Sequence, residues 1–114
     1  MATLNQCSFI GHLGKDPVLE VTSEGKPFTK FSLAVDQGKG KDPMWLNITT
    51  WDKLAETVER FAHKGTQVFV QGRLKLQKYK DRSNTERQGV DIVATIVQIL
   101  DKKPETDEQQ AEQL

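Results

Sequence analysis

The sequence predicts an all-β fold, a small barrel of short strands with one helix between the third and fourth main strands. Apolar residues alternate with polar ones along most of residues 4–100, which is the pattern of strands with one buried face. Only the stretch 52–65 spaces its apolar residues as an amphipathic helix does. The chain has 114 residues, a length typical of one domain.

Turn-forming residues divide the alternating pattern into separate strands. The segments 16–17, 23–27 and 37–43 are dense in Gly, Pro, Ser and Asp, and 80–88 forms a charged hairpin loop. In the first strand, Gly11 and Gly14 allow a bend or a bulge. The strands expected from this division are 4–13, 18–22, 28–35, 44–51, 68–77 and 89–100.

The helix is bounded by residues that favour helix ends. Asp52 stands at the N-cap position, because its carboxylate can accept unpaired amides of the first turn, and Gly65 suits a left-handed exit. The apolar stripe between them consists of Leu54, Val58, Phe61 and Ala62. One helix in this position among short strands is the element order of the OB-fold, a five-stranded Greek-key barrel, although other small barrels also carry one helix.

Residues 1–100 form the predicted domain, and residues 101–114 a short acidic tail. The tail has no aromatic residue and only Thr106 is β-branched, so we expect it to be disordered. The N-terminus lacks the basic and apolar segments of a secretory signal, and no apolar run is long enough to span a membrane. A single cysteine, Cys7, fits a reducing compartment. These features together predict a cytoplasmic protein.

A zero net charge hides an uneven distribution of charged residues. The tail 101–114 has two lysines against five carboxylates, and is therefore acidic. The segment 73–87 has six cations against Asp81 and Glu86, a net charge of +4. Basic runs are usually solvated surface, so this one points to a polyanionic ligand only with geometric support.

The strand 44–51 supplies part of that support. Side chains alternate across a strand, so Met44, Leu46 and Ile48 share one face and both tryptophans, Trp45 and Trp51, share the other. The first face is apolar and predicts a core contact. The second places large aromatic rings among polar residues, where either a ligand or a covering loop, bulge or subunit would explain them.

The strand 68–77 repeats this arrangement and continues to Tyr79. Its inward set is expected to be Val68, Val70, Gly72, Leu74 and Leu76, and its outward set Phe69, Gln71, Arg73, Lys75, Gln77 and Tyr79. Aromatic rings and cations therefore alternate on the solvent side of two strands. Single-stranded nucleic acid is bound by such surfaces, because cations follow the phosphates and flat rings stack on bases.

Several segments of the chain resemble the bacterial-type single-stranded-DNA-binding proteins. Residues 5–17 are similar to that family's first strand, which runs into a Gly-x-Asp-Pro turn. Residues 31–35 resemble its second strand, residues 45–56 its third strand and helix start, and residues 64–74 its helix exit and fourth strand. The resemblance covers residues 4–100 in order.

The resemblance implies a non-catalytic, nucleoid-associated OB-fold homotetramer that coats single-stranded DNA in replication, recombination and repair. It places Trp45, Trp51 and Tyr79 at base-stacking positions and Lys75 at a basic one, while Gln77 replaces a frequent cation. The candidate interface consists of Trp45, Trp51, Tyr79, Lys75, Arg73, Phe69, Gln77, Lys78, Lys30 and Lys15. The final strand gives partial support for self-association, since Val90, Ile92, Ala94 and Ile96 are apolar on one face and Val93, Val97 and Ile99 on the other.

The tail departs from the resemblance, and the residues leave two other functions open. Family members end in a long linker and an acidic tip with a hydrophobic pair that recruits replication and repair enzymes, whereas this chain ends at Glu112-Gln113-Leu114, so recruitment through the tail is not expected. A protein-interaction OB module, such as a replication-restart accessory subunit, is one alternative. An RNA-binding protein is another.

Catalysis and cofactor binding have no support in the sequence. Cys7, His12 and His63 are isolated and do not form the close pairs of a zinc site. Cys7 alternates with Phe9 and is interpreted as a small core residue. We therefore expect no metal, no cofactor and no enzymatic activity.

Overall fold

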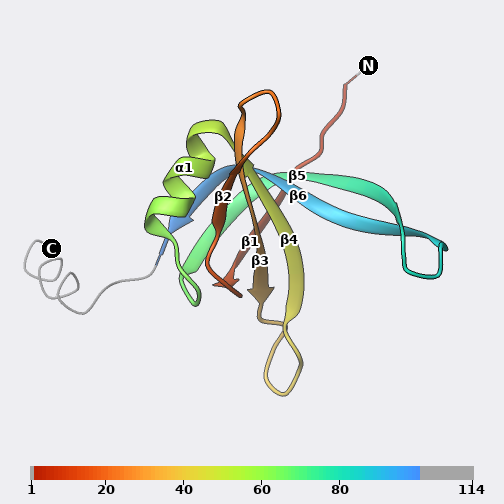
Figure 1. Ribbon diagram of the computed structural model, residues 1–114. Coiled ribbons are helices and arrows are strands. Elements are labelled where there is room, and N and C mark those ends of the chain that lie inside the picture. The colour runs from red at the N-terminus through yellow and green to blue at the C-terminus, as the bar shows by residue number, and fades with distance from the viewer. Residues whose placement is uncertain (1, 101–114) are drawn as a thin grey trace, which may run out of the picture.

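The computed structural model describes residues 2–100, and the predicted disordered tail at 101–114 lies outside the described residues. The elements are β1 (Cys7–Leu13), β2 (Val18–Val21), β3 (Pro27–Val35), β4 (Met44–Trp51), α1 (Asp52–Phe61), β5 (Gln67–Lys80) and β6 (Glu86–Ile99). All expected strands are present, and the single helix lies between β4 and β5 (Figure 1). In residues 2–100 no helix is long and apolar enough to cross a membrane.

Five of the strands close into a barrel. The sheet order is β1-β5-β6-β4-β3-β2, and an additional pairing of β1 with β3 joins the ends of the sheet. The short strand β2 stays outside this ring and pairs only with β3. The pairing of β4 with β6 is parallel, while the others are antiparallel. The prediction of an OB-type five-stranded barrel is confirmed.

The first strand closes the barrel because it pairs with two neighbours. Most of β1 pairs with β5, and its last residues, His12 and Leu13, also pair with β3. At Gly11 the backbones approach so closely that a β-carbon would overlap the carbonyl oxygen of Ala34. The glycine predicted to allow a bend therefore stands where two strands cannot accommodate a side chain.

The barrel interior is filled by apolar side chains from every strand of the ring. Buried residues of this cluster include Leu13, Phe31, Leu33, Ile48, Val58, Val68, Val70, Ile92 and Ala94. Cys7 packs against the cluster, as predicted, and burial raises the pKa of its thiol. The hydroxyl groups of Thr29 and Thr50 bond to each other inside the barrel, which satisfies two polar groups that burial would otherwise penalise.

The helix covers one end of the barrel with small residues rather than with its whole apolar stripe (Figure 1). Ala55, Val58 and Ala62 are buried, but Phe61 is 55% exposed, so its predicted core position was wrong. Its ring instead lies 5.5 Å from the guanidinium carbon of Arg60. The two alanines allow α1 to approach the barrel closely, and this leaves Phe61 at the edge of the contact.

Both predicted helix boundaries differ in detail. Asp52 is the first residue of α1, with a φ of 57°, and Trp51 takes the N-cap position without a side-chain hydrogen bond. The expected N-cap at Asp52 was therefore wrong. Gly65 has the predicted left-handed φ, 88°, but it lies in a turn beyond the helix, where its amide donates to the carbonyl of Leu13 at 2.8 Å.

A bulge between β5 and β6 changes the direction in which their side chains point. Gln71 pairs with Ile96 whereas Gly72 pairs with Ala94, so Thr95 is an extra residue in β6. The hydroxyl of Thr95 donates to the carbonyl of Gln71 at 3.2 Å. Because of this extra residue, Ala94 and Val97 both contact the core and Ile96 is exposed, not on the face of Ile92 as predicted.

Past the bulge, β5 no longer pairs with β1, and the residues of β6 that precede Asp91 pair only with β5. These parts of the two strands project together as an arm, which we define as residues 73–90. Figure 1 shows this ribbon extending well beyond the other strands. Leu74, Leu76 and Val90 lie on the arm and are exposed. The prediction that Leu74 and Leu76 face the core was therefore wrong, because they follow Gly72, the last residue of β5 that pairs with β1.

Gly72→Ala is expected to destabilise the protein by about 1–3 kcal/mol, because a β-carbon there would overlap the carbonyl of Val93 in the neighbouring strand. Urea unfolding at one fixed protein concentration measures the change in free energy. Ser8→Ala, an exposed position on the same sheet, is the control and should change stability by less than about 0.5 kcal/mol. Equal stability of the two variants would contradict this account of the bulge.

Candidate nucleic-acid interface

Two grooves lie on the outer surface of the barrel beside the arm. The first, the Trp51 groove, has a volume of about 430 Å³ and is lined by Thr22, Glu24, Lys26, Trp51, Arg73, Lys75 and Val93. The second, the Asp91 groove, has a volume of about 380 Å³ and is lined by Lys15, Lys30, Phe31, Ser32, Asn47, Ile48, Gln77 and Asp91. Both volumes are in the range of small-ligand sites, about 300–1,000 Å³.

Trp51 is held in place by an aromatic neighbour and approached by a cation. Its ring centroid lies 5.1 Å from that of Phe28, its partner across β3 and β4, at an interplanar angle of 36°. The Nζ of Lys26 is 5.7 Å from the indole centroid. The indole is half-buried, which is less exposed than the sequence predicted. A restrained ring loses little conformational freedom when a base stacks on it.

Trp45 is the more exposed of the two tryptophans, with 58% of its surface accessible. It rests on the glycine turn after β1: a β-carbon at Gly14 would lie 2.6 Å from Cζ3 of the indole and 2.8 Å from Oγ of Ser32. The glycine therefore lets the ring lie against the backbone. The predicted outward orientation of Trp45 is confirmed.

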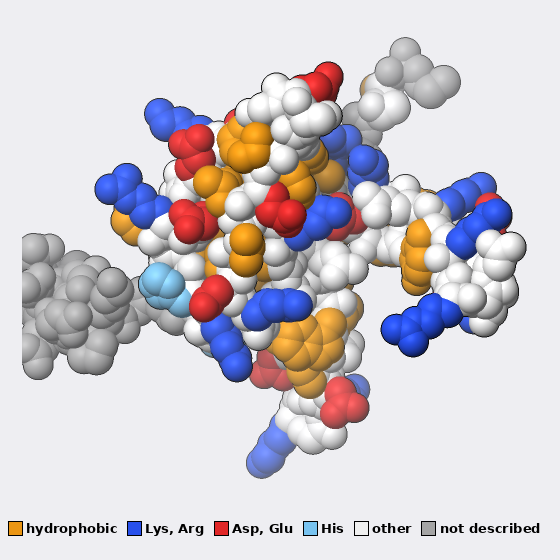
Figure 2. Space-filling view, viewed as in Figure 1, with side chains coloured by type: hydrophobic (Ala, Val, Ile, Leu, Met, Phe, Trp, Pro, Cys, Tyr) orange, Lys and Arg blue, Asp and Glu red, His pale blue; other side chains and the backbone are white. Residues whose placement is uncertain are grey.

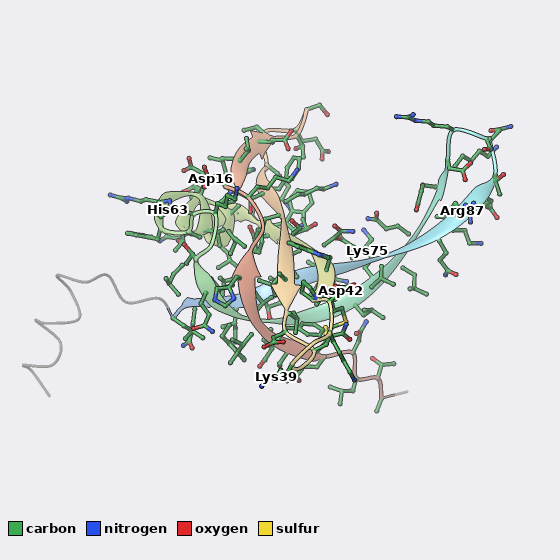
Figure 3. The ribbon with its side chains drawn as sticks, turned by 90° about the horizontal axis from the view of Figure 1, so that it is seen from below. Asp16, Lys39, Asp42, His63, Lys75 and Arg87 are labelled. Carbon is green, nitrogen blue, oxygen red and sulfur yellow. The ribbon has the colours of Figure 1, made fainter. Side chains whose placement is uncertain are left out.

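The arm presents a polar, basic face and an apolar one. Arg73, Lys75, Gln77 and Tyr79 alternate along β5, so they share a face, and Lys78 lies on the opposite face with Leu74 and Leu76. Arg73 and Lys75 reach the Trp51 groove, and Gln77 reaches the Asp91 groove. Tyr79 is 54% exposed and its ring lies beside Gly89. In Figure 3 Lys75 lies near the base of the arm and Arg87 farther out.

Lysines from two other elements complete the basic surroundings. Lys30, on β3, and Lys15, in the turn after β1, line the Asp91 groove. The turn is anchored because the carboxylate of Asp16 accepts the backbone amide of Lys64 at 2.7 Å. Figure 3 shows Asp16 beside His63, close to α1. Nine of the ten candidate residues therefore lie on β3, β4, the arm or this turn.

Phe69 is the candidate residue that lies apart from the others. It precedes the bulge on β5, pairs with Ile10 of β1 and lines neither groove. On β6 its register partner is Gln98, and the exposed Ile96 lies opposite Gln71, diagonal to Phe69. Ile10, Phe69 and Ile96 are thus apolar residues on the outer side of three neighbouring strands, which we call the β1–β5–β6 patch.

The tip of the arm is ordered by one carboxylate. Asp81 accepts the backbone amides of Ser83 and Thr85 at 2.9 and 3.0 Å and pairs with Nε of Arg87 at 2.8 Å. The Arg87 guanidinium, followed by the amide of Thr85, lowers the pKa of this carboxyl. Arg87 is therefore partly neutralised, and much of the free positive charge lies elsewhere. Figure 2 shows Lys and Arg side chains around the arm and over the barrel beside it.

The sequence analysis missed Lys26 and Asp91, which line the grooves, and Phe28, which packs against Trp51. Lys26 and Phe28 flank Trp51, and the pairing of β3 with β4 brings them there. Asp91 is 8% exposed and lines a groove, and its only signal in the sequence is a single charged residue inside an apolar strand. Within residues 2–100 no three His, Cys, Asp or Glu residues are grouped closely enough to hold a metal ion.

Comparisons with known proteins agree with this geometry. The model of the single-strand binding protein family matches residues 4–100. Single-stranded DNA-binding protein 1 of Chlorobaculum tepidum is 34% identical, with coverage of 88% of this chain and 67% of the relative. Single-stranded DNA-binding protein 1 of Xylella fastidiosa is 34% identical, with coverage of 90% and 82%. The single-stranded DNA-binding protein of Thermotoga maritima is 30% identical, with coverage of 91% and 79%.

Asp81→Ala is expected to loosen the tip of the arm and to speed amide exchange at Ser83 and Thr85, because both amides lose their acceptor. The pKa of Asp81 is lowered in the folded state. The hydrogen bonds that its carboxylate accepts therefore hold the tip in place at neutral pH, and this stabilisation is lost as the pH falls through the lowered pKa. Exchange measured by NMR reports both effects. Asp36→Ala, which removes a similar bond in the β3–β4 loop, is the control. Unchanged exchange in Asp81→Ala would contradict this role.

Proposed function

The chain belongs to the single-strand binding protein family, and we propose on that premise that it binds single-stranded DNA with little regard to sequence. The relatives from Chlorobaculum tepidum and Xylella fastidiosa are named as single-stranded DNA-binding proteins. One observation carries the proposal for this chain. A restrained tryptophan, Trp51, lines a groove together with the cations Lys26, Arg73 and Lys75.

The binding mode that we propose joins stacking with phosphate contacts. Bases stack on Trp51 and Trp45, and Tyr79 offers a third ring on the arm. Each stacked base contributes about 1–3 kcal/mol, and the contact tolerates any base because every base has a π-face. Lys15, Lys30 and the arm cations contact phosphates, which makes affinity fall steeply with salt.

The other candidate residues have more peripheral roles in this proposal. Gln77 lines the Asp91 groove and can hydrogen-bond a base or a sugar. Lys78 is on the far face of the arm and contacts a strand only if DNA crosses the arm's edge. Phe69 is better placed for contacts between subunits than for stacking, because it lies in the β1–β5–β6 patch.

We propose that the protein coats and protects single-stranded DNA during replication, recombination and repair. Its place of action is the cytoplasm, in association with the nucleoid, and its protein partners are replication and repair proteins. The role requires no chemical step, in keeping with a family of binding proteins.

We further propose that the protein is a homotetramer. Supporting observations are the β1–β5–β6 patch and the free edge of β1 where it does not pair with β3. Exposed apolar residues that are contiguous across strands are typical of association surfaces.

Trp51→Ala is expected to weaken binding of an oligo-dT by about 1–3 kcal/mol, because one stacked base is lost. Fluorescence anisotropy of a labelled oligonucleotide at several salt concentrations measures the affinity and its salt slope. Trp51→Phe retains an aromatic ring, so its affinity should lie between those of the wild type and of Trp51→Ala. Phe61→Ala removes an exposed aromatic ring on α1 and is the matched control.

The same titration separates the competing functions. Wild-type protein that binds oligo-dT weakly and without salt dependence would favour a protein-interaction module. Tighter binding of oligo-U than of oligo-dT would favour an RNA-binding protein. Equal affinity of the Trp51→Ala and Phe61→Ala variants would refute the stacking role of Trp51.

Ile10→Glu is expected to dissociate the proposed tetramer, because burying a carboxylate at an apolar contact is strongly unfavourable. Light scattering should give a mass near four chains for the wild type and a smaller one for the variant. Val18→Glu, an exposed apolar position on β2, is the control and should retain the wild-type mass. A monomeric wild type would refute the assembly, and an unchanged mass for Ile10→Glu would exclude this patch as its interface.

A further inference from the structure

A buried carboxylate lies inside the basic surroundings of the interface. Asp91 is only 8% exposed, yet it lines the Asp91 groove. Its Oδ2 accepts the hydroxyl of Thr49 at 2.9 Å, and within residues 2–100 its Oδ1 accepts no hydrogen bond. A buried carboxylate needs more than one donor to offset its desolvation. The unused oxygen therefore points to a donor that comes from a ligand.

The surroundings of Asp91 restrict which part of a nucleic acid enters. Asn47 is its register partner across the parallel β4–β6 pair, and Gln77 approaches from the arm. Their amides can donate and accept hydrogen bonds, as a base edge requires. Lys15 and Lys30 supply cations to the same groove. A phosphate is attracted by the lysines but repelled by Asp91, so a base rather than a phosphate is expected to contact the carboxylate.

We propose that the Asp91 groove is a nucleobase subsite that favours guanine and disfavours thymine. A carboxylate only accepts hydrogen bonds. Guanine presents two adjacent donors, its N1–H and its exocyclic amino group, which match the two oxygens of a carboxylate. Thymine presents one N–H between two carbonyl oxygens, which a carboxylate repels. The preference rests on the proposed binding of single-stranded DNA and adds base selectivity at one position.

A purely structural role for Asp91 makes a different prediction. The Thr49–Asp91 bond joins β4 to β6, which share only three paired positions, from Asn47–Asp91 to Thr49–Val93. If the bond served stability alone, affinity would not depend on which base the groove receives. Changes in the ligand therefore separate the two roles without altering the protein.

The experiment compares three oligonucleotides of equal length bound to the wild-type protein. One is oligo-dT, the second has a single central guanine, and the third has deoxyinosine there, which retains N1–H but lacks the amino group. A bidentate base contact discriminates by about 1–3 kcal/mol, so we expect the guanine oligonucleotide to bind about 5- to 150-fold tighter than oligo-dT. Deoxyinosine should lose most of that gain. A single guanine avoids self-association of guanine runs.

Asp91→Asn tests the residue itself. We expect this variant to bind oligo-dT at least as tightly as the wild type and to bind the guanine and deoxyinosine oligonucleotides equally. Asp42→Asn, in the exposed β3–β4 loop, is the matched control and should retain the guanine preference. If Asp91→Asn does not fold, the comparison of guanine with deoxyinosine on the wild type still decides the question.

The outcomes distinguish this inference from the proposed function. Failure of the wild type to bind any of the three oligonucleotides would refute single-stranded DNA binding, and the subsite with it. Tight but equal binding of all three would refute the guanine subsite and leave the proposed function intact. A guanine gain that deoxyinosine retains, or that Asp91→Asn retains, would also refute recognition of the amino group by Asp91.

Discussion

The extra residue at Thr95 is the local feature on which the rest of the structure depends. On the side of this bulge that contains the start of β5 and the end of β6, Val68, Val70 and Val97 point toward the core. Past the bulge, β6 pairs with β4 at Asp91–Val93 and still buries Ile92, whereas β5 has no further pairing with β1, and the two strands then continue together into the arm. A bulge increases local twist and bends the strand that contains it. The arm thus leaves the barrel at an angle that brings Arg73 and Lys75 to the groove of Trp51.

The bulge also explains why a protein with no net charge can offer a basic surface. Charges attract a phosphate over about 8–10 Å in physiological salt, so local arrangement matters more than the total. The pairing of β3 with β4 and the exit of the arm bring Lys26, Arg73 and Lys75 around one ring. Trp51 is held by Phe28, and Trp45 lies on Gly14. Rings fixed before binding reduce the entropy that ordering would cost.

The alternation of apolar and polar residues along the sequence predicted most of the structural elements. It failed at the one-residue bulge in β6 and where α1 packs closely against the barrel. The six strands, the single helix and the outward Trp45 follow from local period alone. The exposed Leu74, Leu76 and Ile96 do not, because Thr95 is β-branched like the nearby Val93 and Ile96, and nothing in its type indicates a bulge. Phe61 was misplaced because helical spacing cannot show how closely α1 approaches the barrel. Asp91 was missed because its significance arises from Thr49 and Asn47, which lie more than forty residues earlier in the chain.

A carboxylate among cations also limits how a strand can lie on this surface. Stacking on Trp51 and Trp45 is indifferent to sequence and sets no direction for the backbone. Asp91 repels phosphates, so in the proposed complex the backbone must follow Lys15 and Lys30 at the rim while a base turns inward. One fixed base orientation between two stacking platforms restricts the direction of the strand as well as its position. A single buried acid can therefore order a complex whose affinity comes from rings and cations.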